Sequence, residues 1–170
     1  PGLVYYGGTI MPGVIGATPF IYSEVMVSTD SGVKGLVLRG IDPESAQSVL
    51  QVLHKMSPED MAALDESGNS DADFPGIIIG RELARLLHVQ KGSLVNLLSP
   101  TGQQGAAGFS TKVATFSVAG IFSTGMFEYD SSLAFVSLAA ARDVLGLPEN
   151  YLSGVELTVD DLFKADQTSA

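Results

Sequence analysis

The stretch at 76–80, Gly-Ile-Ile-Ile-Gly, constrains the fold more than any other part of this 170-residue sequence. An unbroken run of branched apolar residues between two glycines is typical of a short strand that is fully buried. The residues at 81–88 follow at once with an amphipathic helical pattern, in which the leucines and Ala84 face inward. We therefore expect a core large enough to bury this strand, and a chain of this length can supply one.

Strand and helix signals are interspersed along the rest of the chain. Alternating apolar and polar residues predict a hairpin at 21–39, with its turn at 30–32. Asp42, Ser57 and Ser137 are N-cap candidates for three helices, the last of which ends at Leu145 before a glycine. Further strands are predicted at 93–98, 112–122, 133–136 and 153–159. This mixed order indicates the α+β class.

The polar segment at 65–73 is the best candidate for a boundary between two units. It holds four acidic residues together with Ser, Gly and Asn, a composition typical of a solvated loop. Residues 74–150 are predicted to form a strand-rich unit. This unit would be inserted into a second unit made from residues 1–73 and 151–170.

Composition excludes several classes of partner and cofactor. The net charge is −10, from 9 basic and 19 acidic residues, which argues against nucleic acid because phosphate binding depends on clusters of Lys and Arg. The absence of cysteine excludes disulfides and cysteine-ligated metals.

Charged residues make up only 16%, which suggests that part of the surface is covered in the complete molecule. The chain begins Pro1-Gly2, and we expect it to be a fragment of a longer protein.

The sequence offers little from which to build an active site. His54 and His88 stand alone on separate predicted helices, and neither lies in a metal-binding spacing. No nucleophile elbow or phosphate-binding loop is present, and a calcium site at 65–73 lacks the spacing of an EF-hand. We expect no enzyme activity, no metal and no cofactor. A hydrolase that uses a pair of carboxylates is a weaker alternative.

Two connectors are candidates for binding. The segment at 99–111 is longer than an ordinary hairpin loop and carries no charge, so it fits either a flexible loop or a docking arm. The segment at 125–130 places Met126, Phe127 and Tyr129 beside two acids. These apolar side chains either fold back into the core or contact a partner, and we expect them in the core.

Seven strings, taken in this order, resemble the LolC/LolE family of membrane subunits of the lipoprotein-releasing ABC transporter. They are GATPFIY at 16–22, VLRGIDP at 37–43, GIIIGRELA at 76–84, VAGIF at 118–122, GMFEYD at 125–130, AFVSL at 134–138 and SGVELTVDD at 153–161. The resemblance implies a periplasmic domain of a bacterial inner-membrane protein. It also implies a MacB-like core, in which a porter-like subdomain carries an inserted strand-rich subdomain.

The resemblance further implies the partners of such a subunit. These are a second membrane subunit, identical or related, a cytoplasmic ATPase of the LolD type, a lipoprotein substrate and a periplasmic chaperone of the LolA type.

In the family a protruding hairpin recruits the chaperone. The matching residues here are Pro100, Thr101, Gln103, Gln104, Phe109 and Lys112. Its tip is rich in Gly and Ala, so Phe109 is the one large apolar side chain that could fill a pocket. Met126, Phe127 and Tyr129 form a possible second contact surface. A MacB- or FtsX-like domain that transmits force to another periplasmic partner is the alternative.

Overall fold

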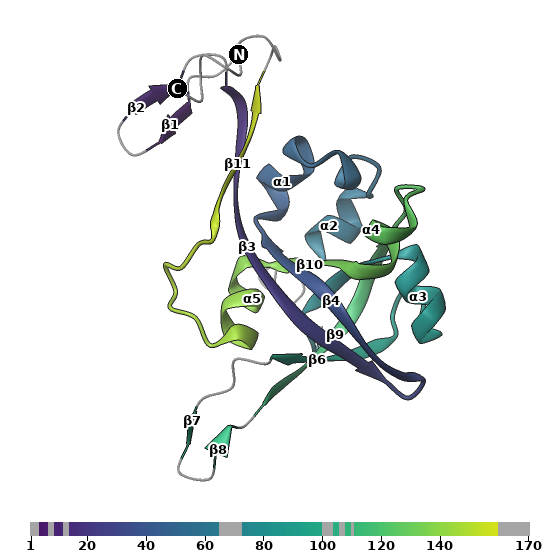
Figure 1. Cartoon of the computed structure of the whole chain (residues 1–170). Coiled ribbons are helices and arrows are strands. Elements are labelled where there is room, and N and C mark those ends of the chain that lie inside the picture. The colour runs from purple at the N-terminus through teal and green to yellow at the C-terminus, as the bar shows by residue number, and fades with distance from the viewer. Residues whose placement is uncertain are drawn as a thin grey trace.

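The computed structural model describes residues 4–6, 9–11, 14–64, 73–99, 104–105, 108–109 and 111–159 (Figure 1). Its strands are β1 (Val4–Tyr6), β2 (Thr9–Met11), β3 (Val14–Thr29), β4 (Gly32–Ile41), β5 (Gly76–Gly80), β6 (Leu94–Ser99), β7 (Gln104–Gly105), β8 (Gly108–Phe109), β9 (Lys112–Phe122), β10 (Leu133–Ser137) and β11 (Gly154–Val159). Its helices are α1 (Pro43–Val49), the 3₁₀ turn η1 (Gln51–Leu53), α2 (Pro58–Ala62), α3 (Arg81–Leu87), α4 (Phe127–Ser132) and α5 (Leu138–Leu145).

The main sheet closes on itself. Its strand order is β11-β3-β4-β10-β5-β9-β6, and β6 pairs back with β3 through Met26–Leu98, Val27–Leu97 and Ser28–Asn96. Six strands therefore form a barrel, and β11 lies outside it, paired with β3 alone. Most neighbours are antiparallel, but β4–β10 and β5–β9 are parallel. Closure removes most of the exposed edge that an open sheet of this size would present.

One hydrophobic cluster fills the barrel. Alternate residues of each strand point inward, among them Val25, Leu38, Ile77, Val95 and Phe116. Leu83 and Leu87 of α3 and two alanines of α5 belong to the same cluster. Leu86, which the helical pattern predicted to face inward, is exposed instead. The two helices that directly follow β5 and β10 therefore seal the barrel interior.

A second cluster lies on the outer face of the barrel, beneath α1, η1 and α2. Leu50, Leu53 and Met61 pack there against outward residues of the strands, including Ile78 and Phe135. Ile77 and Ile79 face the interior cluster while Ile78 faces this outer one, and all three are 0% exposed. The predicted burial of the strand at 76–80 is confirmed, and the two clusters explain it.

Local sequence signals placed most helix ends correctly. The side chains of Asp42, Ser57 and Ser137 accept hydrogen bonds from the backbone N–H three residues on, as predicted for N-caps. Gly146 ends α5 with φ +67°, in the left-handed region that favours glycine. His88 ends α3 and His54 ends η1, so both histidines lie at helix ends.

Two predictions of secondary structure were wrong in detail. The single helix expected after the N-cap Asp42 is split into α1 and η1, because Leu50 adopts an extended conformation between them. The connector at 125–130 contains most of α4, which begins at Phe127. The hairpin at 21–39 is confirmed, and its first strand starts seven residues earlier than predicted, at Val14.

Strands from both predicted units share the main sheet. The ranges 1–73 and 151–170 contribute β3, β4 and β11, and the range 74–150 contributes the other four strands. Residues 65–72 lie outside the described residues, and the division into two units stays a prediction. One large sheet with short helices agrees with the mixed class expected from the sequence.

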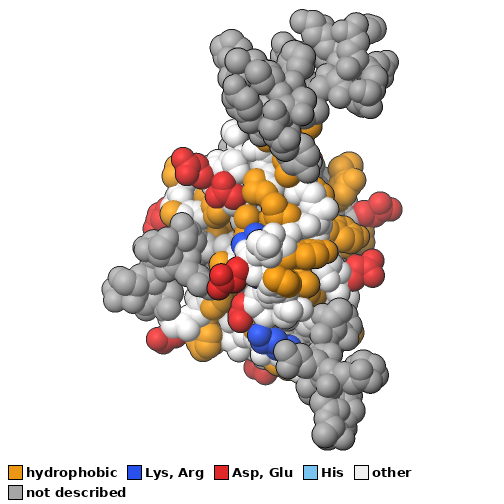
Figure 2. Space-filling view, turned by 90° about the vertical axis from the view of Figure 1, so that its left-hand side faces the viewer, with side chains coloured by type: hydrophobic (Ala, Val, Ile, Leu, Met, Phe, Trp, Pro, Cys, Tyr) orange, Lys and Arg blue, Asp and Glu red, His pale blue; other side chains and the backbone are white. Residues whose placement is uncertain are grey.

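Several apolar side chains are exposed on the side of the molecule formed by β11, among polar and charged ones. Figure 2 shows hydrophobic side chains gathered on this face. Leu157 of β11 is exposed and lies opposite Ala17 of β3, and Tyr151 and Leu152 are exposed just before the strand. Within the described ranges, the structure contains no helix with the length and hydrophobicity needed to span a membrane.

Candidate functional site

The connector at 99–111 contains a small hairpin that stands away from the barrel (Figure 1). Its strands β7 and β8 pair antiparallel, with Gln104 opposite Phe109 and Gly105 opposite Gly108. We call β7, β8 and their connections to β6 and β9 the arm. Of the predicted contact residues, Pro100, Thr101 and Gln103 lie outside the described residues, and only the backbones of Gln104 and Phe109 are described.

Lys112, the last predicted contact residue of the arm, has a local role. It is the first residue of β9, and its Nζ donates a hydrogen bond of 2.5 Å to the backbone oxygen of Asp143 in the last turn of α5. The same Nζ lies 3.3 Å from the Asp143 carboxylate. A cation near a helix C-terminus satisfies carbonyls that the helix leaves unpaired. Lys112 therefore ties the base of the arm to α5.

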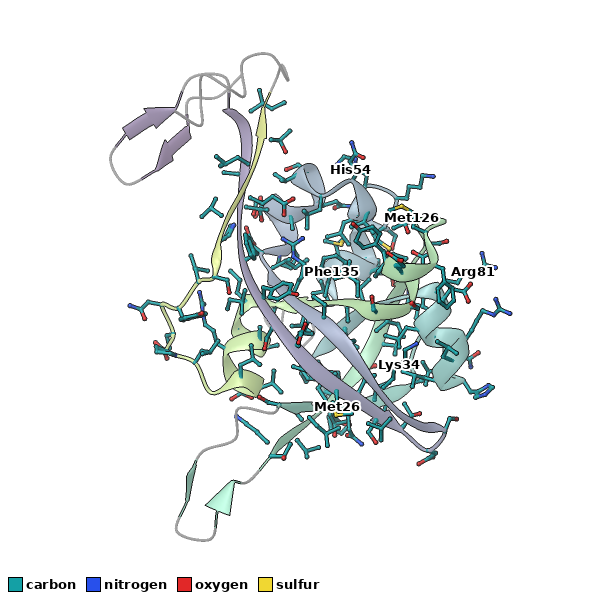
Figure 3. The ribbon with its side chains drawn as sticks, in the orientation of Figure 1. Met26, Lys34, His54, Arg81, Met126 and Phe135 are labelled. Carbon is teal, nitrogen blue, oxygen red and sulfur yellow. The ribbon has the colours of Figure 1, made fainter. Side chains whose placement is uncertain are left out.

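An apolar row lies on the outer face of the barrel at the base of the arm. Met26, Leu98 and Val113 are register partners on three adjacent strands. Met26 and Val113 are exposed, and Leu98 is partly buried. Figure 3 shows Met26 close to the point where β6 leads into the arm. The sequence pattern did not single out this row, because the pairing of β3 with β6 creates it.

Met126, Phe127 and Tyr129 are exposed, so the core interpretation of these side chains was wrong. Their exposed fractions are 53%, 63% and 52%. Met126 is the N-cap of α4, and the other two lie in the first turn of this helix. Three large apolar side chains within four consecutive residues are an unusual concentration for a free surface. The structure therefore brings the second predicted contact surface together on one short helix.

Asp130 holds the loop that precedes this surface. The side chain is buried, with 4% of the residue exposed. Its Oδ1 accepts from the backbone N–H and the hydroxyl of Thr124, at 2.8 and 2.7 Å. Its Oδ2 accepts from the N–H of Gly125 at 3.1 Å and from Ser123 at 3.5 Å. Burial alone raises the pKa of Asp130, but the hydrogen bonds from Thr124, Gly125 and Ser123 outweigh it and leave the pKa below its ordinary value.

A pocket of about 440 Å³ opens beside the exposed apolar surface. Arg39 and Lys55 line it, together with Val52, Leu133 and the buried ring of Phe135. The sequence pattern did not indicate this pocket, because its walls come from four separate segments. The available signal was Arg39 itself, the one charged residue in the apolar second half of β4, at 36–41.

Arg39 is held at the pocket by contacts on two sides. Its Nη2 forms an ion pair with Glu156 at 2.7 Å, and its guanidinium carbon lies 4.9 Å from the centre of the Phe20 ring. Its Nε is buried without a hydrogen-bond partner among the described residues. Where the structure describes the chain, no three His, Asp or Glu side chains come together in an arrangement that could hold a metal ion.

Sequence comparison relates the chain to transmembrane proteins of lipoprotein-releasing systems. It is 28% identical to LolC of Neisseria meningitidis serogroup B over 88% of this chain, and 29% identical to LolC of Xylella fastidiosa over 89%. It is 24% identical to LolE of Haemophilus influenzae over 91%. The chain spans only about a third of the length of these relatives, 34% for both LolC proteins. No protein-family model matches the chain.

Structure comparison gives a fold relative. The extracellular domain of the noncanonic ABC-type transporter YknZ from Gram-positive bacteria superposes with a TM-score of 0.55. The match covers 93% of this chain and 72% of that domain, at 13% sequence identity. The fold is therefore similar to that of an extracellular domain of an ABC transporter.

Proposed function

Because the chain is a homologue of the LolC and LolE transmembrane proteins over most of its length, we propose that it is the periplasmic domain of an ABC transporter permease subunit. The sequence relationship is the observation that carries the proposal. The complete subunit would lie in a bacterial inner membrane, pair with a second membrane subunit and be driven by a separate cytoplasmic ATPase. Its task would be to release lipoproteins from that membrane. The MacB-like division into a porter-like unit and an inserted unit belongs to the same proposal.

The placement of the first and last long strands supports this role. Val14 at the start of β3 pairs with Val159 at the end of β11, so the first and last residues of the main sheet lie side by side. The barrel and the arm lie towards the opposite end of the molecule (Figure 1). A domain inserted between two neighbouring membrane helices requires adjacent ends of this kind. Movements of the helices would reach the barrel through the β3–β11 pair.

The arm is the part of the domain best suited to recruit a chaperone. It projects from the barrel, and the apolar row of Met26, Leu98 and Val113 extends the available surface at its base. A projecting hairpin can enter a groove of a partner, while an apolar row beside it excludes water from the contact. We assign chaperone binding to Pro100, Thr101, Gln103, Gln104 and Phe109, with Lys112 fixing the base.

Binding of a purified LolA-type chaperone to this chain tests the recruitment role. Titration calorimetry should detect binding to the unaltered chain. Phe109→Ala should weaken the affinity about tenfold or more, because large aromatic side chains dominate the energetics of interfaces. Phe74→Ala is the matched control, since Phe74 is an exposed phenylalanine outside the arm and its removal should leave the affinity unchanged.

Two results would count against recruitment by the arm. Equal affinity of the Phe109→Ala chain and the unaltered chain would contradict the assignment of the contact to Phe109. No binding by the unaltered chain would contradict recruitment itself and favour a domain that transmits force to a different periplasmic partner. Neither result would alter the sequence relationship to LolC and LolE.

A further inference from the structure

The pocket beside α4 combines features that point to a second binding site, separate from the arm. We propose that it binds an extended segment of a partner protein, in which a large apolar side chain lies next to an Asp or Glu. We call it the α4 pocket, lined by Arg39, Lys55, Val52, Leu133 and Phe135 and bordered by Met126, Phe127 and Tyr129. This proposal goes beyond chaperone recruitment and does not depend on the arm.

The charge of the lining selects a carboxylate. The chain carries a net charge of −10, yet the residues that line the α4 pocket include two cations and no anion. Lys55 forms no ion pair among the described residues, and Arg39 uses only Nη2 for its pair with Glu156. Arg39 also has a buried Nε without a hydrogen-bond partner in the described part of the chain. An incoming carboxylate would therefore meet the ammonium group of Lys55, which no described acidic residue pairs, beside Arg39, whose ion pair with Glu156 occupies Nη2 only.

The apolar walls and border select a large apolar side chain beside that carboxylate. Val52, Leu133 and the buried Phe135 line the pocket, and Figure 3 shows Met126 nearer the surface than Phe135. A volume of about 440 Å³ lies within the range of small binding pockets, so it can accept one or two side chains. Aromatic residues and arginine grouped around a pocket are typical of interface centres.

The border extends beyond the pocket, which favours a protein segment over a small free anion. Phe127 does not line the pocket but is the most exposed of the three border residues, at 63%. A small ligand in the pocket would leave this ring in water, whereas a polypeptide that enters the pocket would continue across it. The shape of the surface therefore fits a chain that crosses α4.

Contacts with the interior of the fold fix the conformation of the residues that border the pocket. Asp130 binds the N–H groups of Thr124 and Gly125, and Gly125 has φ +81°, in the left-handed region that favours glycine. The backbone of Asp130 also lies against Gly80, where a Cβ would approach the Asp130 carbonyl oxygen to 2.1 Å. A preformed border loses little freedom on binding, which favours affinity for a flexible segment.

Selection from a random twelve-residue peptide library on the immobilised chain tests the proposal. Enriched peptides should share a large apolar residue within two positions of Asp or Glu. Their binding should weaken about tenfold or more with Lys55→Glu or Phe127→Ser, both of which change exposed residues and leave the two clusters intact. Arg81→Glu and Leu86→Ser, on exposed positions of α3, are the matched controls and should leave binding unchanged.

Three outcomes would overturn the proposal. The first is that the selection enriches no peptide. The second is that the enriched peptides bind the Lys55→Glu and Phe127→Ser variants as tightly as the unaltered chain. The third is that laurate binds in the pocket while no peptide is selected. The last would identify a lipid site in place of a peptide site. Phe109→Ala should leave peptide binding unchanged, so failure of this proposal and failure of chaperone recruitment can be told apart.

Discussion

Replacing Gly80 by alanine should lower the free energy of unfolding by about 2–3 kcal/mol. Gly80 ends β5 and caps α3, and a Cβ at this position would lie 2.1 Å from the backbone oxygen of Asp130 and 2.7 Å from its Cα. Backbone atoms cannot rotate away as a flexible side chain can, so α4 must shift. Urea unfolding followed by circular dichroism measures the effect.

Gly35→Ala provides the matched control for this substitution. Gly35 lies in β4, and a Cβ there would meet no atom within 4 Å. The free energy of unfolding of the Gly35→Ala chain should stay within about 0.5 kcal/mol of that of the unaltered chain, as for most surface substitutions. Equal free energies of unfolding for the Gly80→Ala and Gly35→Ala chains would contradict the close packing of β5 against α4.

Asp130→Asn should cost about 2 kcal/mol of stability, because hydrogen bonds to a charged acceptor are stronger than neutral ones and buried donors lose a partner. The asparagine oxygen can still accept from the N–H of Thr124. Its amide nitrogen would face the N–H of Gly125, which now donates to Oδ2 at 3.1 Å. Glu128→Gln, an exposed acid on the same helix, is the control and should change stability little.

The stability difference between the unaltered chain and Asp130→Asn should depend on pH. The folded pKa of Asp130 lies below its ordinary value of about 3.9, so the unfolded chain takes up the proton first as pH falls. The contribution of the carboxylate is therefore complete above about pH 5 and is lost as pH falls below about 3.9. Urea titrations of both chains at a series of pH values should show the gap shrinking; a gap that widens on acidification would contradict the network.

Local physical signals explain why much of the secondary structure could be predicted. Asp42, Ser57 and Ser137 cap helices because their short oxygens reach backbone N–H groups, which depends only on neighbouring residues. Gly146 ends α5 for an equally local reason. The continuous apolar run at 76–80 correctly indicated burial on both faces.

Barrel closure could not be predicted in the same way. The β3–β6 pairing joins Met26 to Leu98 although β4, α1, η1, α2, β5 and α3 all lie between these two strands in the sequence. No pattern within either strand specifies its partner. The closure also leaves Met26, Leu98 and Val113 as one row. The pocket beside α4 also joins residues that are distant in sequence, such as Arg39 of β4 and Lys55 after η1. It could therefore be identified only from the three-dimensional structure.

The sequence indicated where both candidate surfaces lie, but it did not indicate that the side chains at 126–129 are exposed. Met126, Phe127 and Tyr129 were correctly noted as unusual, but apolar character alone favoured burial and the structure leaves them exposed. The reason is that Asp130 and Ser131 take the buried positions on α4, which leaves the residues before them on the outer side. The length and composition of the connector at 99–111 indicated a special segment, and β7 and β8 are paired within it. The role of its residues in chaperone binding stays a prediction.

Release of a lipoprotein from proteoliposomes tests the central proposal most directly. The full-length subunit would be reconstituted with its partner membrane subunit and ATPase, and a fluorescent lipoprotein would be followed from the membrane onto a soluble LolA-type chaperone. We predict release that requires ATP and that is lost when residues 102–109 are replaced by a Gly-Ser linker. A reconstituted complex that hydrolyses ATP in the presence of chaperone yet leaves all of the lipoprotein in the membrane would contradict the proposed function.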